Sequence, residues 1–269
     1  MDTFLEAGKV AKEISRRGVK ITIKADKSPV TDGDLAVDEL LRDKIANLTP
    51  DIPIISEETI NIEIKNQNKT FWLIDPIDGT KAYIKKKGEY TLNAALIINS
   101  IPAVGIIYAP EKDRLFFSYG KDCAFEINNG KKITLSCKKI NTNEIIALAN
   151  SDKTPNEVLD IYKKYKVTRT IRMPSSFKFC VLAAGEADIY AARARAFEWD
   201  IAAGHTILEH AGGSVTTHDE KKILYGKKDY KNLSIIAKRS LNLEKEITTL
   251  SCINFLNLSL FFNLIKRYT

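Results

Sequence analysis

Histidine and cysteine are scarce in this chain of 269 residues. With only His205, His210 and His218 present, chemistry that needs a constellation of histidines is not expected. The four cysteines include no Cys-x-x-Cys pair, which argues against a structural zinc site or a redox dithiol. No cysteine has an arginine six positions later, so the Cys-x5-Arg phosphatase loop is excluded. Four scattered thiols fit a reducing compartment, and we expect a cytoplasmic protein.

The chain also shows no long hydrophobic run, no internal repeat and no linker rich in Pro, Gly or Ser. Its first six residues have neither a basic start nor an apolar run, so no signal peptide is expected. Residues 250–265 hold 11 apolar residues among 16, fewer than the roughly 20 that span a bilayer. We interpret residues 241–269 as an appended apolar tail that packs on the body or is disordered. The alternative is a peripheral contact with the cytoplasmic face of the inner membrane.

Charge is ordinary in amount and biased in sign, with 41 Lys and Arg against 34 Asp and Glu, a net +7. This excess indicates either anionic ligands or a compositional bias. Clusters of basic residues with interleaved aromatics are missing, so no nucleic-acid partner is expected.

Apolar periodicity divides the chain into two halves without a linker, for which we expect an N-terminal α+β unit (1–140) and a C-terminal α/β unit (141–240). In the first half we expect two helices followed by strands; the ranges are 3–17, about 32–48, 52–55, 71–74, 91–98, 103–108, 115–118 and 133–135. Thr31 followed by Asp34 indicates the capped start of the second helix, whose apolar stripe would be Leu35, Leu41, Ile45 and Leu48. In the second half we expect strands and helices over 145–149, 156–165, 175–185, 188–192, 200–211 and 234–237.

Acidic residues lie where apolar strands end. Asp75 follows the run Phe71–Ile74, and Pro76 would break the strand ladder there. Asp78 can turn back toward Asp75, and Gly79 lets the backbone approach a ligand. Two carboxylates and a carbonyl at one bend are hard oxygen ligands of the kind that Mg²⁺ prefers.

Each of these acids has a simpler interpretation. Asp-Pro and Asp-Gly are common turn pairs. Glu57 and Glu58, which follow a second apolar run, could simply be solvated surface residues. Asp200 could be no more than a helix cap. Asp32-Gly33-Asp34 imitates an Asp-x-Asp phosphatase loop, but no long apolar strand precedes it, and we interpret it as a helix cap.

Taken together, the acidic segments resemble the inositol monophosphatase-like, lithium-sensitive phosphatases. The residues that carry this resemblance occur in the family's order; they are Ser28-Pro29-Val30-Thr31 with Asp34, Ser56-Glu57-Glu58, Trp72 to Thr80, and Trp199 to His205. The resemblance covers about residues 3–240 and implies an α+β fold, a layered αβαβα sandwich of the sugar-phosphatase type.

Within this superfamily the chain is most similar to the 3′(2′),5′-bisphosphate nucleotidases of CysQ type. The segments that indicate this branch are 24–31, 81–93 with Gly88-Glu89-Tyr90-Thr91-Leu92-Asn93, 104–110, and Ser175 to Cys180.

The resemblance implies a site that holds two or three Mg²⁺ ions. One ion would be held by Glu57, Asp75 and the Ile77 carbonyl, and a second by Asp75, Asp78 and Asp200. A third, weaker ion would lie near Glu57, with Glu58 close by. The implied catalytic residues are Asp34, Thr80 and Glu58, of which Thr80 and Asp34 would orient and deprotonate a water molecule.

The implied reaction is removal of the 3′-phosphate of adenosine 3′,5′-bisphosphate, a step of sulfur metabolism, by a monomer or homodimer. Besides the metal ligands Glu57, Ile77, Asp78 and Asp200, the resemblance assigns substrate contacts to Gly79, Thr80, Ser175, Ser176 and Lys178. For Lys178, a contact with the 5′-phosphate and a solvated helix lysine are equally open.

Two departures and two rival functions remain open. Between Tyr190 and Trp199, where the family usually has an Arg-Phe-Gly-Pro-Thr-like loop, this chain has Arg193 and Arg195 in a loop without the Gly-Pro turn, which puts substrate choice in doubt. The tail after Ser240 is the second departure.

An inositol- or sugar-phosphate phosphatase on the same site is one rival function, and a non-catalytic RNA- or protein-associated member is the other.

Overall fold

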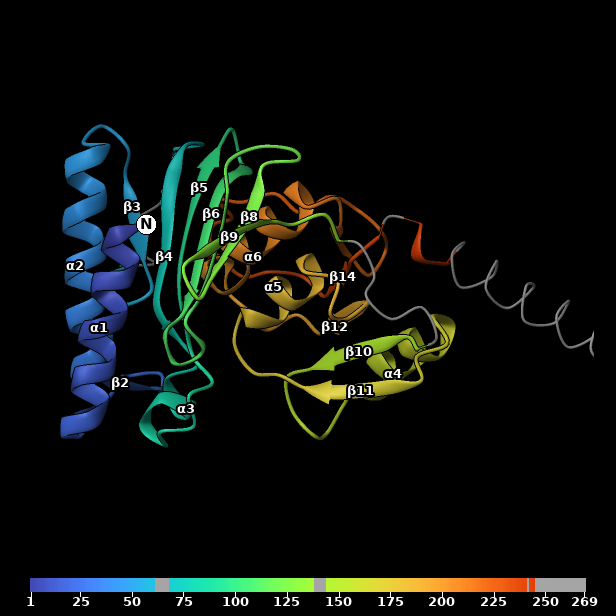
Figure 1. The fold of residues 1–269 in the computed structure, drawn as a ribbon, viewed down its shortest axis with the longest axis horizontal. Helices are drawn as coiled ribbons and strands as arrows, with labels where there is room; N and C mark the ends of the chain where they lie inside the picture. The colour runs from blue at the N-terminus through green and yellow to red at the C-terminus, as the bar shows by residue number, and fades with distance from the viewer. Residues whose placement is uncertain (61–67, 138–143, 241, 245–269) are drawn as a thin grey trace, which may run out of the picture.

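Five layers of secondary structure make up the protein, in the order helix, sheet, helix, sheet, helix (Figure 1). The structure is a computed structural model that describes residues 1–60, 68–137, 144–240 and 242–244. The expected αβαβα sandwich is therefore confirmed. Apart from residues 242–244, the expected tail at 241–269 lies outside the described residues.

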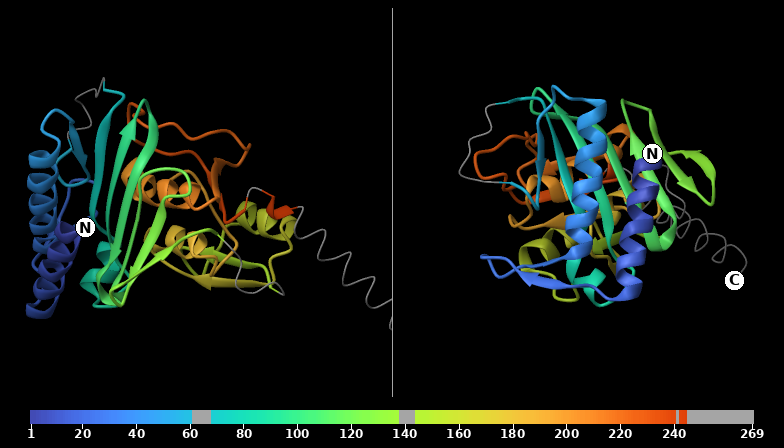
Figure 2. Two further views of the ribbon diagram at one scale, coloured as in Figure 1. Left: turned by 45° about the horizontal axis from the view of Figure 1, so that its top comes forward. Right: turned by 90° about the vertical axis from the view of Figure 1, so that its left-hand side faces the viewer.

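The first helical layer covers one face of the larger sheet (Figure 2). It consists of α1 (Asp2–Arg17) and α2 (Asp32–Leu48). The sheet has seven strands in the spatial order β3-β4-β5-β6-β7-β8-β9. Their bounds are β3 (Ile54–Ser56), β4 (Phe71–Asp78), β5 (Thr91–Ile98), β6 (Ile101–Ala109), β7 (Arg114–Ser118), β8 (Ala124–Asn128) and β9 (Lys131–Thr134). All neighbours are antiparallel except β3 and β4, which are parallel.

The start of α2 confirms the predicted helix cap. Thr31 Oγ1 accepts hydrogen bonds from the N–H groups of Gly33 and Asp34, and the Asp34 carboxylate accepts one from Thr31 N–H at 2.8 Å. This reciprocal arrangement satisfies donors that the first turn of a helix leaves free. The Asp-x-Asp loop interpretation was therefore rightly rejected.

The predicted apolar stripe of α2 is wrong at two of its four positions. Leu41 and Ile45 are buried together with Val37, but Leu35 and Leu48 are 51% and 78% exposed. Leu35 precedes Val37 by two residues, about 200° around the helix, so it faces away from the packed side. Leu48 is the last helical residue.

Strand β4 does not stop at Pro76, contrary to the sequence-based expectation. It continues to Asp78, with a register shift against β5 between Asp75 and Asp78. Pro76 is tolerated because the irregular pairing at this point needs no N–H from it. The strand therefore carries both acids, one on each side of the irregularity.

The second half contributes the inner helices, a smaller sheet and an outer helix. The inner helices are α5 (Phe177–Ala183) and α6 (Glu198–His210), and α6 packs against β5 and β6. The five-stranded mixed sheet has the order β11 (Arg169–Arg172), β10 (Ile146–Ala149), β12 (Ile189–Ala192), β14 (Ile235–Lys238), β13 (Ser214–Thr217). Helix α4 (Asn156–Lys164) covers its outer face, where Tyr162 donates a hydrogen bond to the Leu148 carbonyl at 2.6 Å.

The sequence analysis missed several short elements. They are β1 (Ile21–Ile23), β2 (Pro29–Thr31), α3 (Thr80–Ile84), the 3₁₀ turn Pro110–Lys112, and strands β8, β11 and β13. All are only three to five residues long, and β11 and β13 also depend on partners well separated in the chain, since Arg169 pairs with Ile146 and Ser214 with Lys238. The division at residue 140 stays a prediction. Within the described residues, no helix is both long enough and apolar enough to cross a bilayer.

Candidate active site

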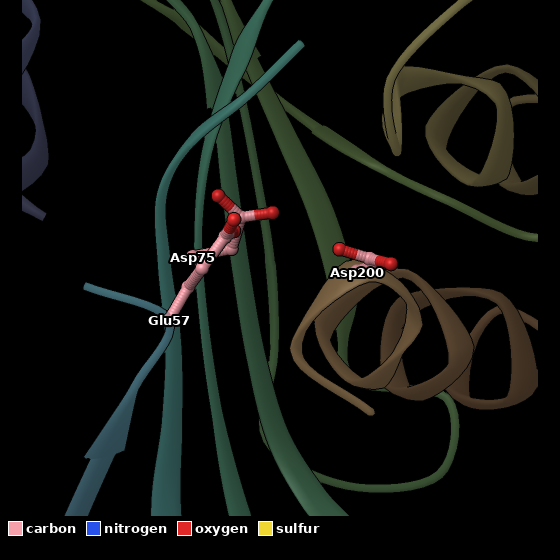
Figure 3. A group of neighbouring side chains, drawn as sticks. All are labelled: Glu57, Asp75 and Asp200. Atoms are coloured by element: carbon pink, nitrogen blue, oxygen red, sulfur yellow. The ribbon is translucent and has the colours of Figure 1, made fainter. Parts of the chain in front are cut away.

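Three carboxylates from separate elements meet beside the larger sheet. Glu57 directly follows β3, Asp75 lies in β4, and Asp200 lies in the first turn of α6 (Figure 3). One ligand oxygen of each lies within 4.8 Å of the others. Parallel pairing of β3 with β4 places Glu57 beside Asp75, since Glu57 N–H donates to the Ile74 carbonyl at 3.1 Å. Asp200 is held by its Oδ2, which accepts a hydrogen bond from Phe197 N–H at 2.7 Å.

Burial and mutual repulsion oppose the ionisation of these acids. Burial, followed by repulsion from Glu57, raises the pKa of Asp75 well above its usual range. Burial, followed by repulsion from Asp200, raises the pKa of Glu57 to about 8. Burial and Asp78 raise the pKa of Asp200 to about 7. A cluster of like charges in a poorly solvated place is stable in its ionised form only with positive charge nearby.

The donor set fits a divalent cation. Asp75 is 1% exposed, and within the described part of the chain no hydrogen-bond donor reaches its Oδ1. The three ligands are carboxylate oxygens, the hard donors that suit Mg²⁺, and soft sulfur or imidazole ligands do not take part. Glu57, Asp75 and Asp200 could therefore hold such an ion.

Asp78 and Ile77 lie next to the cluster of Glu57, Asp75 and Asp200 but are not members of it. Asp78 lines the same cavity, and one of its oxygens accepts a hydrogen bond from Ser176 N–H. Burial raises the pKa of Asp78, although Lys178 and the Ser176 hydrogen bond act in the opposite direction. The Ile77 carbonyl accepts a hydrogen bond from the Thr80 hydroxyl at 3.3 Å.

A second polar unit joins Asp34 and Thr80. Thr80 Oγ1 donates to Asp34 Oδ1 at 3.2 Å, while Asp34 Oδ2 is held by Thr31. Burial raises the pKa of Asp34 against the effect of these hydrogen bonds. Gly79, between Asp78 and Thr80, has φ +102°, and an added Cβ would lie 2.9 Å from the Glu89 carbonyl oxygen. The tight turn that presents Thr80 to the cavity therefore requires glycine.

Glu58 forms an ion pair that the sequence analysis did not anticipate. Lys24 Nζ, from the loop between β1 and β2, lies 2.6 Å from Glu58 Oε2 and 3.7 Å from Glu57 Oε1. Burial alone would lower the pKa of Lys24, but Glu58 and Glu57 raise it. The only sequence signal was the position of Lys24 just before the Ser28-Pro29-Val30-Thr31 segment.

Glu57, Asp78 and Asp200 line a cavity of about 420 Å³. Ser175 and Lys178 also line it, together with Lys81, Tyr190 and Arg195. Lys178 is 6% exposed, so the alternative of a solvated helix lysine is wrong. Its Nζ donates to the Ser175 carbonyl and lies 4.9 Å from the centre of the Tyr190 ring. Burial lowers the pKa of Lys178 to about 8 despite attraction from Asp78 and Asp200.

Ser176 occupies a different place from its neighbours. It is 1% exposed and does not line the cavity. Its hydroxyl lies 2.8 Å from Thr91 Oγ1 and donates to Asn93 Oδ1 at 2.7 Å. With its N–H on Asp78, Ser176 joins α5 to β5 and to the end of β4.

Comparisons with known proteins show which family the chain resembles in sequence. The sequence model of the inositol monophosphatase family matches residues 1–254. The 3′(2′),5′-bisphosphate nucleotidase CysQ of Buchnera aphidicola is 40% identical over 76% of this chain and 76% of its own length. The CysQ nucleotidase of Escherichia coli K12 is 34% identical over 76% of this chain and 82% of its own.

A solved structure of a member of the same family has a similar fold. The crystal structure of CysQ from Bacteroides thetaiotaomicron, a bacterial member of the inositol monophosphatase family, superposes with a TM-score of 0.75. It is 32% identical in sequence, and the match covers 88% of this chain and 94% of that one.

Proposed function

The chain belongs to the inositol monophosphatase family, and from this premise we propose that it removes the 3′-phosphate of adenosine 3′,5′-bisphosphate, giving AMP and phosphate. The observation that carries the proposal is the carboxylate cluster, whose members lie within 4.8 Å of one another and of which Glu57 and Asp200 line a cavity of about 420 Å³. Three cations, Lys81, Lys178 and Arg195, line the same cavity and suit an anionic substrate. We choose this substrate because the relatives named above are 3′(2′),5′-bisphosphate nucleotidases.

The proposed metal ligands follow from the cluster. Glu57, Asp75 and the Ile77 carbonyl would hold one Mg²⁺, and Asp75, Asp78 and Asp200 a second, so that Asp75 serves both. A third would lie near Glu57 and Glu58, where Lys24 now supplies the positive charge. When bound, Mg²⁺ would neutralise charge on the phosphoryl oxygens and make a water molecule more acidic.

The remaining residues would position the reactants. Thr80 and Asp34 form a hydrogen-bonded pair at the cavity, and we assign them to orienting the attacking water and accepting its proton at Asp34 Oδ1. The N–H groups of Gly79 and Thr80 would hold the phosphate, because the backbone there can approach a ligand closely. Attack in line with the leaving ribose oxygen needs no covalent intermediate with the protein.

A phosphate-release assay on a panel of substrates tests this function. Purified protein is given adenosine 3′,5′-bisphosphate or inositol 1-phosphate, with Mg²⁺ or with EDTA, and kcat/KM is measured for each. We expect Mg²⁺-dependent hydrolysis with a clear preference for the adenosine bisphosphate. The Asp75→Asn variant should be inactive, whereas Asp160→Asn, on exposed α4, should be unaffected and serves as the matched control.

A preference for inositol 1-phosphate would refute the substrate and keep the phosphatase. Absence of hydrolysis of any panel member by a folded, Mg²⁺-loaded protein would refute the enzymatic proposal.

A further inference from the structure

A second cavity adjoins the candidate active site. It has a volume of about 200 Å³ and lies between the loop before α4 and the loop after β12. Asn150 and Arg195 line both cavities, so they form the boundary between them. Asn150 is fixed there, since its Nδ2 donates to the Tyr190 hydroxyl at 2.7 Å. A molecule larger than one phosphate group could thus extend from the carboxylates past Arg195.

Arg195 differs from Arg193 in having no counter-charge among the described residues. Within the described residues, no carboxylate lies within 4.0 Å of its guanidinium, whereas Arg193, two residues away, has its Nε 3.5 Å from Glu157 Oε1. Arg195 is nevertheless close enough to the active-site wall to act on the pKa values of Lys178 and Asp200. It is an exposed, permanently charged group that lines a cavity, and in the part of the chain that the structure describes no acceptor takes its hydrogen-bond donors.

Lys178, which lines the active-site cavity together with Arg195 and Lys81, is already engaged. It is buried, donates to the Ser175 carbonyl, and lies in the field of Asp78 and Asp200. Its charge therefore offsets nearby carboxylates and leaves less for a ligand. Of the three cations that line the active-site cavity, Arg195 alone also lines the second cavity, and it has no counter-ion among the described residues, so this place favours an additional anion.

We propose that Arg195 binds the second phosphate of a bisphosphorylated substrate and thereby sets the preference for a bisphosphate over a monophosphate. The inference rests on the proposed function, since the scissile phosphate must lie at the carboxylate cluster. A guanidinium suits this task because it presents parallel N–H donors to two phosphate oxygens. A substrate with a single phosphate leaves Arg195 in water and gains nothing from it.

Two substrates with the same scissile phosphate test the assignment. Adenosine 3′,5′-bisphosphate and adenosine 3′-monophosphate differ only in the second phosphate. For Arg195→Ala we expect kcat/KM on the bisphosphate to fall about 10- to 100-fold, mainly through KM, because a charge-assisted contact is lost. On the monophosphate the change should stay within about threefold. Arg195→Lys should recover part of the loss, since it keeps the charge without the paired donors.

The matched control is Arg193→Ala, which removes the same charge from the same loop. We expect less than about a threefold change on either substrate, because Arg193 already faces Glu157. An independent measurement is binding of AMP and adenosine by calorimetry without metal. AMP should bind more tightly than adenosine to the unsubstituted protein, and Arg195→Ala should remove that difference.

The outcomes separate this inference from the proposed function. Equal losses on both substrates in Arg195→Ala would show an effect on the reaction centre and overturn the inference, as would no loss on either. A selective loss in Arg193→Ala instead would also overturn it. A protein that hydrolyses neither adenosine phosphate overturns the proposed function. The calorimetry then still decides whether Arg195 recognises a 5′-phosphate.

Discussion

Binding of Mg²⁺ should stabilise this protein in a strongly pH-dependent manner. In the metal-free protein the pKa of Glu57 is about 8 and that of Asp200 about 7. Between pH 8 and pH 6 the ionised fraction falls from about 50% to about 1% for Glu57, and from about 90% to about 10% for Asp200. Because the ligands must be deprotonated, we expect Mg²⁺ affinity to weaken by at least about 50-fold over this interval.

The size of the effect on stability follows from mass action. At a Mg²⁺ concentration of about 100 times Kd at pH 8, the ion adds about 2.7 kcal/mol to the free energy of unfolding. A Kd that is about 50-fold weaker at pH 6 leaves about 0.7 kcal/mol at the same concentration. For a chain of this length, these values correspond to Tm increases of about 5–10 °C at pH 8 and about 1–3 °C at pH 6.

Without metal the pH trend should have the opposite sign. Acids whose pKa is raised on folding contribute stability that is complete below their unfolded pKa, near 4, and is lost as pH rises through the folded values of about 7 and 8. In EDTA the Tm should therefore fall from pH 6 to pH 8, while the Mg²⁺-induced increase in Tm becomes larger.

Thermal unfolding at pH 6, 7 and 8 and constant ionic strength, in EDTA and in Mg²⁺, checks both trends. Asp75→Asn should lose the Mg²⁺-induced shift at every pH. Asp160→Asn changes the charge equally on the exposed face of α4, where its carboxylate pairs with Lys163 at 3.0 Å, and should retain the shift. A Mg²⁺ shift of equal size at pH 6 and pH 8 would refute the reasoning.

Three further substitutions probe the site and the layer behind it. Asp78→Asn should lower kcat by about 100-fold or more while the protein still folds, as steady-state kinetics and circular dichroism would show, because a metal ligand that stabilises the transition state is lost. Thr80→Ala should reduce kcat about 100-fold while Thr80→Ser stays within a few-fold, because serine keeps the hydroxyl that donates to Asp34; kinetics at saturating substrate would separate them. Gly105→Ala should cost about 1–3 kcal/mol in urea unfolding, because its Cβ would lie 2.5 Å from the Ala203 carbonyl oxygen of α6.

Local structure was largely predictable because its causes are local. The Thr31–Asp34 cap determines where α2 begins, and apolar runs located β4, β5 and β10 to within a few residues. The prediction failed at Leu35, because periodicity shows that a helix has an apolar face without showing which neighbour it meets. It also failed for β11 and β13, short strands that hydrogen-bond to partners far away in the chain.

The chemistry of the site was readable in the residue types. Acids placed after apolar runs, in a particular order, indicated hard-oxygen metal ligands at Glu57, Asp75 and Asp200. By contrast, no pattern in the sequence revealed the Lys24–Glu58 ion pair or the burial of Lys178. Both depend on which distant segments pack together.

The sequence by itself determined the helix cap, the strand cores, the identity of the candidate ligands and the family. Only the tertiary structure decided that three carboxylates lie close together, that their pKa values rise, and that Arg195 lines two cavities with no counter-charge among the described residues. The physical reason is that residue type and hydrogen bonding within a turn act between chain neighbours. Electrostatic coupling and desolvation, by contrast, act between groups that come together only when distant segments pack.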